Sequence, residues 1–361
     1  MSAPRPKQTI LEIEHYRPGA AMAPGFERPI KLSANENPLG ASPRAVAAYA
    51  EAQHALNRYP DPRANALREA IAAKHSLDPA RIVFGTGSDE LFSMACQAYL
   101  QPGDVMVQPQ FAFAAWAIAA RASGAIVRSA PERAFHVDVD ALLDAVDTQT
   151  RVLFVANPAN PTGTRIAASE IRRLHAGRRP DVLLVLDGAY AEFGGEEDEF
   201  SAYADAPNVL ITRTFSKLYG LAGLRVGWGY AAKPVSDVLN RIRLPFNASS
   251  PALASARAAF SDDAFVAASV AHAMKGREKL KLLLEALGLE VLPPSANFVT
   301  ARFPPGSPLS AVQACEALAR WGVLVRGLEP YGMPDFIRVS VCADGDWPQV
   351  RAAFEAVLGE R

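Results

Sequence analysis

Cysteine and net charge are both scarce in this sequence of 361 residues. The three cysteines, Cys96, Cys315 and Cys342, are too far apart for a disulfide framework or a metal-binding pair. No two of the six histidines have the i,i+4 spacing that places metal ligands on one helix face, so no metal site is predicted. The net charge of −1 excludes a global basic field that would attract nucleic acid.

Long apolar runs are also missing. The longest, residues 111–120, is too short to span a bilayer, so no membrane association is predicted. The first nine residues contain no apolar segment of the kind that secretion signals need. We therefore expect a cytoplasmic protein whose cysteines are reduced.

What the sequence does contain is a series of short apolar segments that alternate with helical patterns. A chain of this length predicts two domains. Strands are expected at residues 82–84, 104–109, 151–157, 181–187 and 208–212. Strands that alternate with helices favour an α/β fold with a parallel sheet and right-handed crossovers.

Polar or aromatic side chains follow most of these strands directly. They are Gly87, Ser88 and Asp89 after the first strand, Phe111 after the second, Asn160 after the third, Asp187 and Tyr190 after the fourth, and Thr214, Ser216 and Lys217 after the fifth. Each alone is compatible with an ordinary surface loop, and Phe111 is equally compatible with the core. Ligands of parallel sheets bind beyond the carboxyl ends of the strands, so the coincidence at successive ends predicts one shared site.

The chemistry of these groups specifies a ligand. The glycine-rich turn before a helix is suited to a phosphate, with Ser88 or Asp89 as the expected helix cap. A buried carboxylate such as Asp187 needs a positive partner, and a lysine such as Lys217 can react with a carbonyl. Pyridoxal 5′-phosphate combines a phosphate, a basic ring nitrogen and an aldehyde, so it is the predicted cofactor.

Several motifs resemble those of fold-type-I pyridoxal-phosphate-dependent aminotransferases. They are Asn157-Pro-Ala-Asn-Pro-Thr-Gly163, Asp187-Gly-Ala-Tyr190 and Ser216-Lys217-Leu-Tyr-Gly-Leu-Ala-Gly-Leu-Arg225. Further motifs are similar to the histidinol-phosphate aminotransferase subfamily: Tyr16-Arg-Pro-Gly19, Asn35-Glu-Asn-Pro38, Tyr59-Pro-Asp-Pro62, Val325-Arg326 and Phe336-Ile-Arg338-Val. The resemblance covers nearly the whole chain. Two positions depart from it: Gly188 replaces an acidic residue, and Cys342-Ala343 replaces a glycine.

The resemblance implies a role for each site residue. Lys217 would bind the cofactor covalently and then carry a proton, and Asp187 would pair with the pyridine nitrogen. Tyr190 and Asn160 would bond the ring's phenolic oxygen, and Phe111 would stack on the ring. The phosphate would be held by Gly87, Ser88, Asp89, Thr214, Ser216 and Arg225, with Tyr59 reaching it from the neighbouring subunit of a homodimer.

The last third of the chain contributes candidates for substrate binding. One long helical pattern runs over residues 251–287, and strands are expected at residues 297–302, 322–326 and 336–341. Arg326 and Arg338 each face away from an apolar side of a strand, which indicates either solvated side chains or an anion clamp. The resemblance implies that both bind the acidic group of the substrate while Tyr16 covers its imidazole ring.

The resemblance also implies an architecture and a reaction. The expected fold has a large domain with a mostly parallel seven-stranded sheet between helices, a smaller α+β domain and an N-terminal arm. The expected boundaries are 1–40 for the arm, 41–250 for the large domain and 251–361 for the small one. The expected reaction transfers the amino group of histidinol phosphate to 2-oxoglutarate, so the partners are a small-molecule amino donor and a 2-oxo acid.

Other functions remain open at this point. An aromatic amino-acid aminotransferase would have a similar apolar pocket, and a threonine-phosphate decarboxylase would share the cofactor and phosphate sites. A non-enzymatic sensor would need a DNA-binding segment, and the first 40 residues contain no helix-turn-helix pattern.

Overall fold

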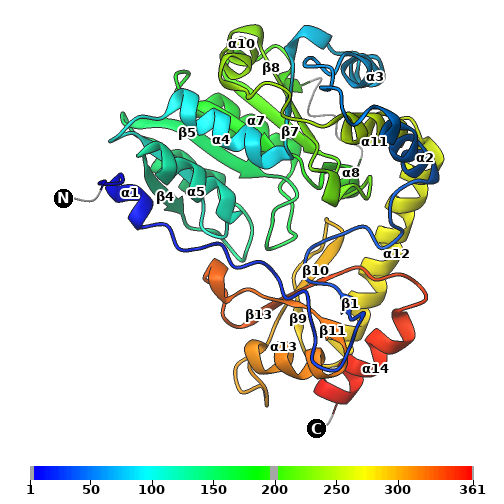
Figure 1. Cartoon of the computed structure of the whole chain (residues 1–361). Helices are drawn as coiled ribbons and strands as arrows, with labels where there is room; N and C mark the ends of the chain where they lie inside the picture. The colour runs from blue at the N-terminus through cyan, green and yellow to red at the C-terminus, as the bar shows by residue number, and fades with distance from the viewer. Residues whose placement is uncertain (1–3, 196–201, 360–361) are drawn as a thin grey trace.

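The computed structural model describes residues 4–195 and 202–359. Figure 1 shows a larger part built around one sheet, a smaller part built around another, and an N-terminal segment that passes between them. None of the helices in the described ranges has the length and apolar character needed to cross a membrane.

The larger sheet has seven strands in the order β2-β8-β7-β6-β5-β3-β4. Their bounds are β2 Ile82–Gly85, β3 Val105–Pro109, β4 Ile126–Ala130, β5 Thr150–Ala156, β6 Leu183–Asp187, β7 Val209–Thr214 and β8 Gly227–Ala231. β8 runs antiparallel to both of its neighbours, and every other pairing in the sheet is parallel. The predicted mostly parallel seven-stranded sheet is therefore confirmed.

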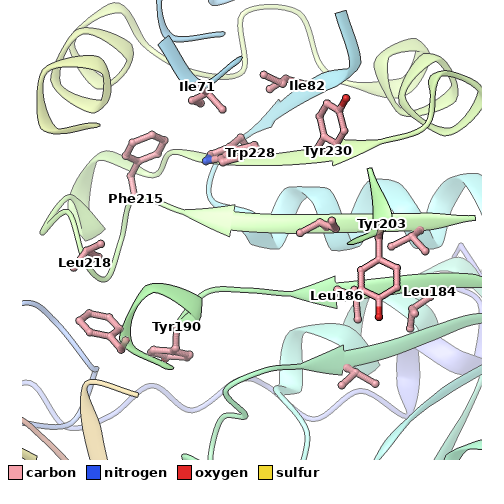
Figure 2. Close-up of a cluster of buried hydrophobic side chains, with 14 of the residues drawn as sticks. Ile71, Ile82, Leu184, Leu186, Tyr190, Tyr203, Phe215, Leu218, Trp228 and Tyr230 are labelled. Carbon is pink, nitrogen blue, oxygen red and sulfur yellow. The ribbon is translucent and has the colours of Figure 1, made fainter. Parts of the chain in front are cut away.

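Both faces of this sheet are covered because its strands are apolar on both sides. One face packs on α4 (Ser88–Tyr99), α5 (Ala114–Ser123) and α10 (Lys233–Ile242). The other packs on α3 (Asn65–His75), α6 (Val139–Ala145), α7 (Ala168–Gly177) and α11 (Ser250–Phe260). Figure 2 shows this second core, in which Leu184 and Leu186 of β6 point the same way as Trp228 and Tyr230 of β8. Successive residues of a strand point to opposite faces of the sheet, so each strand contributes side chains to both cores.

The smaller sheet has four strands in the order β12-β13-β10-β9. Their bounds are β9 Glu290–Val291, β10 Phe298–Arg302, β12 Arg326–Gly327 and β13 Phe336–Ser340. The long α12 (Asp263–Ala286), α13 (Ala311–Arg320) and α14 (Trp347–Leu358) contribute to the core beside it. All its pairings are antiparallel, which allows short connections between strands.

The N-terminal arm is fixed at two places. α1 (Gln8–Leu11) lies near α5, where Thr9 Oγ1 donates to the carbonyl of Arg121 at 2.7 Å. β1 (Ile30–Lys31) pairs in parallel with β11 (Val323–Leu324) beside the smaller sheet. The next residues then lead to α2 (Pro43–Ala52), where the Ser42 side chain accepts from the amide of Ala45. The arm is thus built into the structure by strand pairing and hydrogen bonds.

Two predicted elements differ from the structure. The strand expected at residues 322–326 is two short strands, β11 and β12, which belong to different sheets. The helical pattern of residues 251–287 is split into α11 and α12, because Asp262 caps a new helix through its bond from the amide of Phe265. α11 then packs against α2 and α3, on the core of the larger sheet. The division of the chain at residue 250 remains a prediction.

Candidate functional site

A cavity of about 250 Å³ opens where the carboxyl ends of β5, β6 and β7 face the arm and the smaller sheet. Most of the predicted site residues line it. They are Tyr16, Ser88, Asp89, Asn160, Asp187, Tyr190, Thr214, Ser216, Lys217, Arg225, Arg326 and Arg338. Those from Ser88 to Arg225 lie at strand ends of the larger sheet or in the segments that follow, so the order of the strands brings them together. Tyr16 comes from the arm, and Arg326 and Arg338 come from the smaller sheet.

Lys217 projects from the loop that follows β7. Its neighbours Phe215 and Leu218 are fully buried in the core, which fixes the backbone on both sides of the lysine (Figure 2). Lys217 Nζ donates to the carbonyl of Ala34 in the arm at 3.0 Å. Burial, assisted by the positive charge of Arg338, lowers the pKa of this amine to about 8. A useful fraction of Lys217 is therefore an uncharged nucleophile near neutral pH.

Asp187 is the last residue of β6 and is buried. Its Oδ1 accepts from the amide of Ala189 at 3.0 Å and from the Thr212 hydroxyl at 3.5 Å. Burial raises the pKa of this carboxyl to about 7, and the nearby charge of Asp89 adds to the rise. A carboxylate in this position favours a ligand that brings a positive charge or a proton.

The turn between β2 and α4 forms one end of the cavity together with Arg225. Gly87 has φ +75°, and a Cβ on it would lie 2.4 Å from Nη2 of Arg225. Arg225 donates to Asp89 Oδ2 at 3.1 Å and to Ser216 Oγ at 3.2 Å. The free amides of the first turn of α4 and this guanidinium provide donors for an anion such as phosphate.

The expected helix cap at this turn was wrong. The N-cap position of α4 is Gly87, and no side chain caps the helix there. Asp89 is instead paired with Arg225, and burial raises the pKa of its carboxyl. The backbone geometry of the glycine thus takes the place of a capping side chain, which leaves the first amides of α4 available.

Tyr190 and Asn160 approach the cavity from the segments that follow β6 and β5. The Tyr190 hydroxyl accepts from Asn35 Nδ2 at 2.9 Å, and burial raises its pKa to about 12, so it is a neutral donor. Asn160 Oδ1 accepts from the guanidinium of Arg338. The side chain of Asn35 lies among the predicted site residues, although the sequence assigned it no role.

Two arginines from neighbouring strands of the smaller sheet line the cavity. Arg326 of β12 and Arg338 of β13 are paired directly across the two strands. Arg338 Nη2 donates to the carbonyl of Ser33 at 3.1 Å, and its Nε has no hydrogen-bond partner among the described residues. Arg326 Nη2 donates to the carbonyl of Arg17 at 2.7 Å. The structure thus places both arginines of the expected clamp at one cavity, and their role in binding an anion stays a prediction.

Tyr16 and Tyr331 close this end of the cavity. Both line it, and burial, followed by the influence of Tyr331, raises the pKa of Tyr16. The guanidinium carbon of Arg326 lies 5.9 Å from the centre of the Tyr331 ring. Tyr331 belongs to a short 3₁₀ turn, Glu329–Tyr331, that the sequence did not single out.

Phe111 does not line the cavity. Its ring stacks on Phe135 at 5.6 Å between centroids, beside Phe336. Phe113, two residues further along, lines the cavity instead. The chain has left β3 at this point, so the alternation of a strand no longer determines which side chain faces the site.

Tyr59 is also outside the cavity of its own chain. Its side chain is 82% exposed and stacks on Phe246 at 4.5 Å between ring centroids. Tyr49 and Leu56, which precede Tyr59 in the chain, and Leu244, two residues before Phe246, are also exposed. A role for Tyr59 in cofactor binding would therefore need a second copy of the chain.

The arrangement can carry out covalent chemistry on a flat, phosphorylated ring compound. An uncharged amine can attack a carbonyl, a buried carboxyl can hold a protonated ring nitrogen, and the α4 turn can hold a phosphate. The paired arginines leave a second place for an anion, which suits an acidic substrate. Such a site defines a class of α/β enzymes that bind one phosphorylated ring cofactor and one anionic substrate at the same sheet edge.

Comparison with known proteins identifies the family. The pattern for "Aminotransferase class I and II" matches residues 27–357. The chain is 48% identical over 339 residues to histidinol-phosphate aminotransferase 1 of Caulobacter vibrioides, covering 93% of this chain and 94% of that protein. It is 45% identical over 339 residues to histidinol-phosphate aminotransferase of Maricaulis maris, again covering 93% and 94% of the two chains.

A solved structure shows the same architecture. The crystal structure of histidinol-phosphate aminotransferase from Sinorhizobium meliloti in complex with pyridoxal 5′-phosphate superposes with a TM-score of 0.89. The two sequences are 25% identical, and the match covers 99% of this chain and 98% of the other. The chain belongs to the class I and II aminotransferase family, and the resemblance seen in its motifs is confirmed.

Proposed function

We propose that this chain is a pyridoxal-phosphate-dependent aminotransferase that transfers the amino group of L-histidinol phosphate to 2-oxoglutarate. The products would be imidazole-acetol phosphate and L-glutamate, a step of histidine biosynthesis. The observation that carries the proposal is the buried Lys217 amine, with its lowered pKa, in one cavity with Asp187 and the α4 turn.

The residues of the cavity fit the cofactor. When bound, pyridoxal phosphate supplies an electron-withdrawing ring that makes the substrate's Cα proton removable. Lys217 would hold the cofactor and later move a proton at Cα. Asp187 would keep the ring nitrogen protonated, and Tyr190 would donate to the phenolic oxygen with Asn160 beside it. Phosphate contacts would come from the first amides of α4 at Gly87, Ser88 and Asp89, and from Thr214, Ser216 and Arg225.

The substrate assignment is supported by the second anion site. Arg326 and Arg338 are paired on neighbouring strands and both line the cavity, where they would bind the acidic group that each of the two alternating substrates carries. Tyr16 and Tyr331 would contact the imidazole ring. The names of the relatives support histidinol phosphate over an aromatic amino acid.

We also infer a homodimer with shared active sites. The support is Tyr59, whose aromatic side chain is exposed, does not line the cavity of its own chain and stacks on Phe246, which is also exposed. The arm 1–40, the large domain 41–250 and the small domain 251–361 would act as its units. The thiols of Cys96, Cys315 and Cys342 are free, which suits the reducing conditions of the cytoplasm.

A substrate comparison tests this function. With 2-oxoglutarate as acceptor, we expect kcat/KM for histidinol phosphate to exceed that for phenylalanine and tyrosine by at least a factor of about 100, because only the first has a phosphate for the arginines. Equal values would contradict the assignment in favour of an aromatic aminotransferase. Release of CO₂ from threonine phosphate would instead indicate a decarboxylase.

A further inference from the structure

Asn35 occupies an unusual position between the two sheets. Its side chain is buried and its φ is +56°, a left-handed conformation that asparagine tolerates better than most residues. The backbone amide donates to Ser340 Oγ at 2.8 Å, and the backbone carbonyl accepts from Asn297 Nδ2 at 3.0 Å. The smaller sheet and the segment leading into it therefore fix the backbone of Asn35.

The side chain of Asn35 reaches across to the larger sheet. Its Nδ2 donates to the Tyr190 hydroxyl at 2.9 Å, while its Oδ1 lies 3.2 Å from Ser340 Oγ. A tyrosine hydroxyl has one hydrogen. Because the oxygen of Tyr190 accepts from Asn35, its own hydrogen is available to point into the cavity.

β13 carries both the residue that anchors Asn35 and an arginine that would bind the acidic group of the substrate. Ser340 and Arg338 are both on β13 and lie two residues apart, on one face of the strand. Arg338 lines the cavity, and Ser340 anchors Asn35. A continuous set of hydrogen bonds thus leads from the strand of the anion clamp to the hydroxyl beside the cofactor.

We propose that Asn35 is a positioning residue that fixes the Tyr190 hydroxyl as a hydrogen-bond donor toward the phenolic oxygen of the cofactor. This inference rests on the proposed function, because it concerns the same bound ring. Asn35 lines the cavity, but in this role it acts through Tyr190 and not on the reacting carbon. It acts by giving the Tyr190 oxygen a donor, so that the hydroxyl cannot turn its hydrogen away from the cavity.

The pH titration of the visible absorbance of the cofactor-loaded protein measures this effect. A hydrogen bond to the phenolic oxygen stabilises its anionic form and so favours loss of the proton from the chromophore. Tyr190→Phe removes the bond and should raise the titration midpoint. Asn35→Ala weakens the same bond and should raise the midpoint by about 0.4 to 1 unit, as expected for one hydrogen bond.

A double-mutant cycle separates this role from a general loosening of the arm. If Asn35 acts through Tyr190, the double variant should have the same titration midpoint as Tyr190→Phe alone. Equal shifts in both backgrounds would overturn the proposal, as would an unshifted midpoint in Asn35→Ala. Asn37→Ala is the matched control, because Asn37 lies in the same segment but donates to Leu218 and Ser269, and its midpoint should stay unchanged.

A second variant applies if Asn35→Ala does not fold. Ser340→Ala keeps the side-chain amide of Asn35 but removes its anchor on β13. It should therefore also raise the titration midpoint, by a smaller amount than Asn35→Ala. An unchanged midpoint would contradict the anchoring role. Failure of the proposed function would look different: the purified protein would form no visible chromophore, and borohydride would fix no cofactor to Lys217.

Discussion

At the scale of single residues, the environment of Lys217 determines when the site can react. Burial lowers the pKa of the lysine from 10.5 to about 8, and the positive charge of Arg338 acts in the same direction. At pH 7 roughly 10% of such an amine is uncharged, against about 0.03% of an ordinary lysine. The folded protein therefore gains a reactive amine without a dedicated base beside it.

This lowered pKa predicts how cofactor capture by the apoprotein depends on pH. The rate should rise about tenfold per unit below pH 8, because only the uncharged amine attacks the aldehyde, and should level off above it. Stopped-flow absorbance with excess pyridoxal phosphate measures this rate. A rise that continues to pH 10 would show that Lys217 has an ordinary pKa.

Lys217→Ala should still bind the cofactor, but without covalent attachment and without transamination.

A second prediction at this scale concerns Asp187. Asp187→Asn removes the charge that would hold a protonated ring nitrogen and leaves the volume of the side chain nearly unchanged. We expect kcat to fall on the order of 10²- to 10³-fold, as for the loss of one partner of a buried ion pair. Steady-state kinetics at saturating cofactor measures it. Asp181→Asn, an exposed aspartate before the same strand, should leave kcat unchanged.

At the scale of elements, the contact between the α4 turn and Arg225 leaves no room for an added Cβ on Gly87. Gly87→Ala would place a Cβ 2.4 Å from the arginine and would also strain a residue with φ +75°. Cofactor affinity should fall roughly 10- to 100-fold, because the guanidinium must leave its charge-assisted contacts. Fluorescence titration of the apoprotein measures the affinity.

Gly103→Ala is the control for Gly87→Ala. Gly103 also has a positive φ, +94°, but a Cβ on it would meet no atom within 4 Å. Both variants should lose stability from backbone strain, about 1–2 kcal/mol each. Only the variant at Gly87 should lose cofactor affinity. Equal affinities in the two variants would mean that the turn does not hold the phosphate.

The elements also show how far the sequence could predict the site. Polar residues that directly follow predicted strands can be found in the sequence. They can be assigned to one site because the carboxyl ends of parallel strands meet at one edge of the sheet, whatever the exact register. Lys217, Asp187 and Ser88 were found in this way. Phe113 and Asn35 were not, because their direction depends on irregular backbone and on partners far along the chain. The antiparallel β8 was missed because its sequence, rich in glycine, has no continuous apolar run.

At the scale of the whole molecule, the cavity exists only where three parts meet. The larger sheet supplies Lys217 and Asp187, the smaller sheet supplies Arg326 and Arg338, and the arm supplies Tyr16 and Asn35. Figure 1 shows the arm passing between the two sheets. Any movement of the smaller sheet on the larger one would change the distance between the two arginines and Lys217. The arm restricts such movement, because its carbonyls accept hydrogen bonds from Lys217 and from Arg338.

The largest-scale prediction is that a second copy of the chain completes each site. Tyr59 would contact the cofactor phosphate in the site of its partner, so Tyr59→Ala should weaken cofactor binding. Lys217→Ala should abolish activity because it removes the reactive amine. In mixed dimers of the two variants, formed by co-refolding, one site carries both changes and the other carries neither. At equal ratio about a quarter of all sites should then be native, and activity at limiting cofactor should return to that level. If Tyr59 served its own chain, every site would carry at least one change, and mixing would restore nothing.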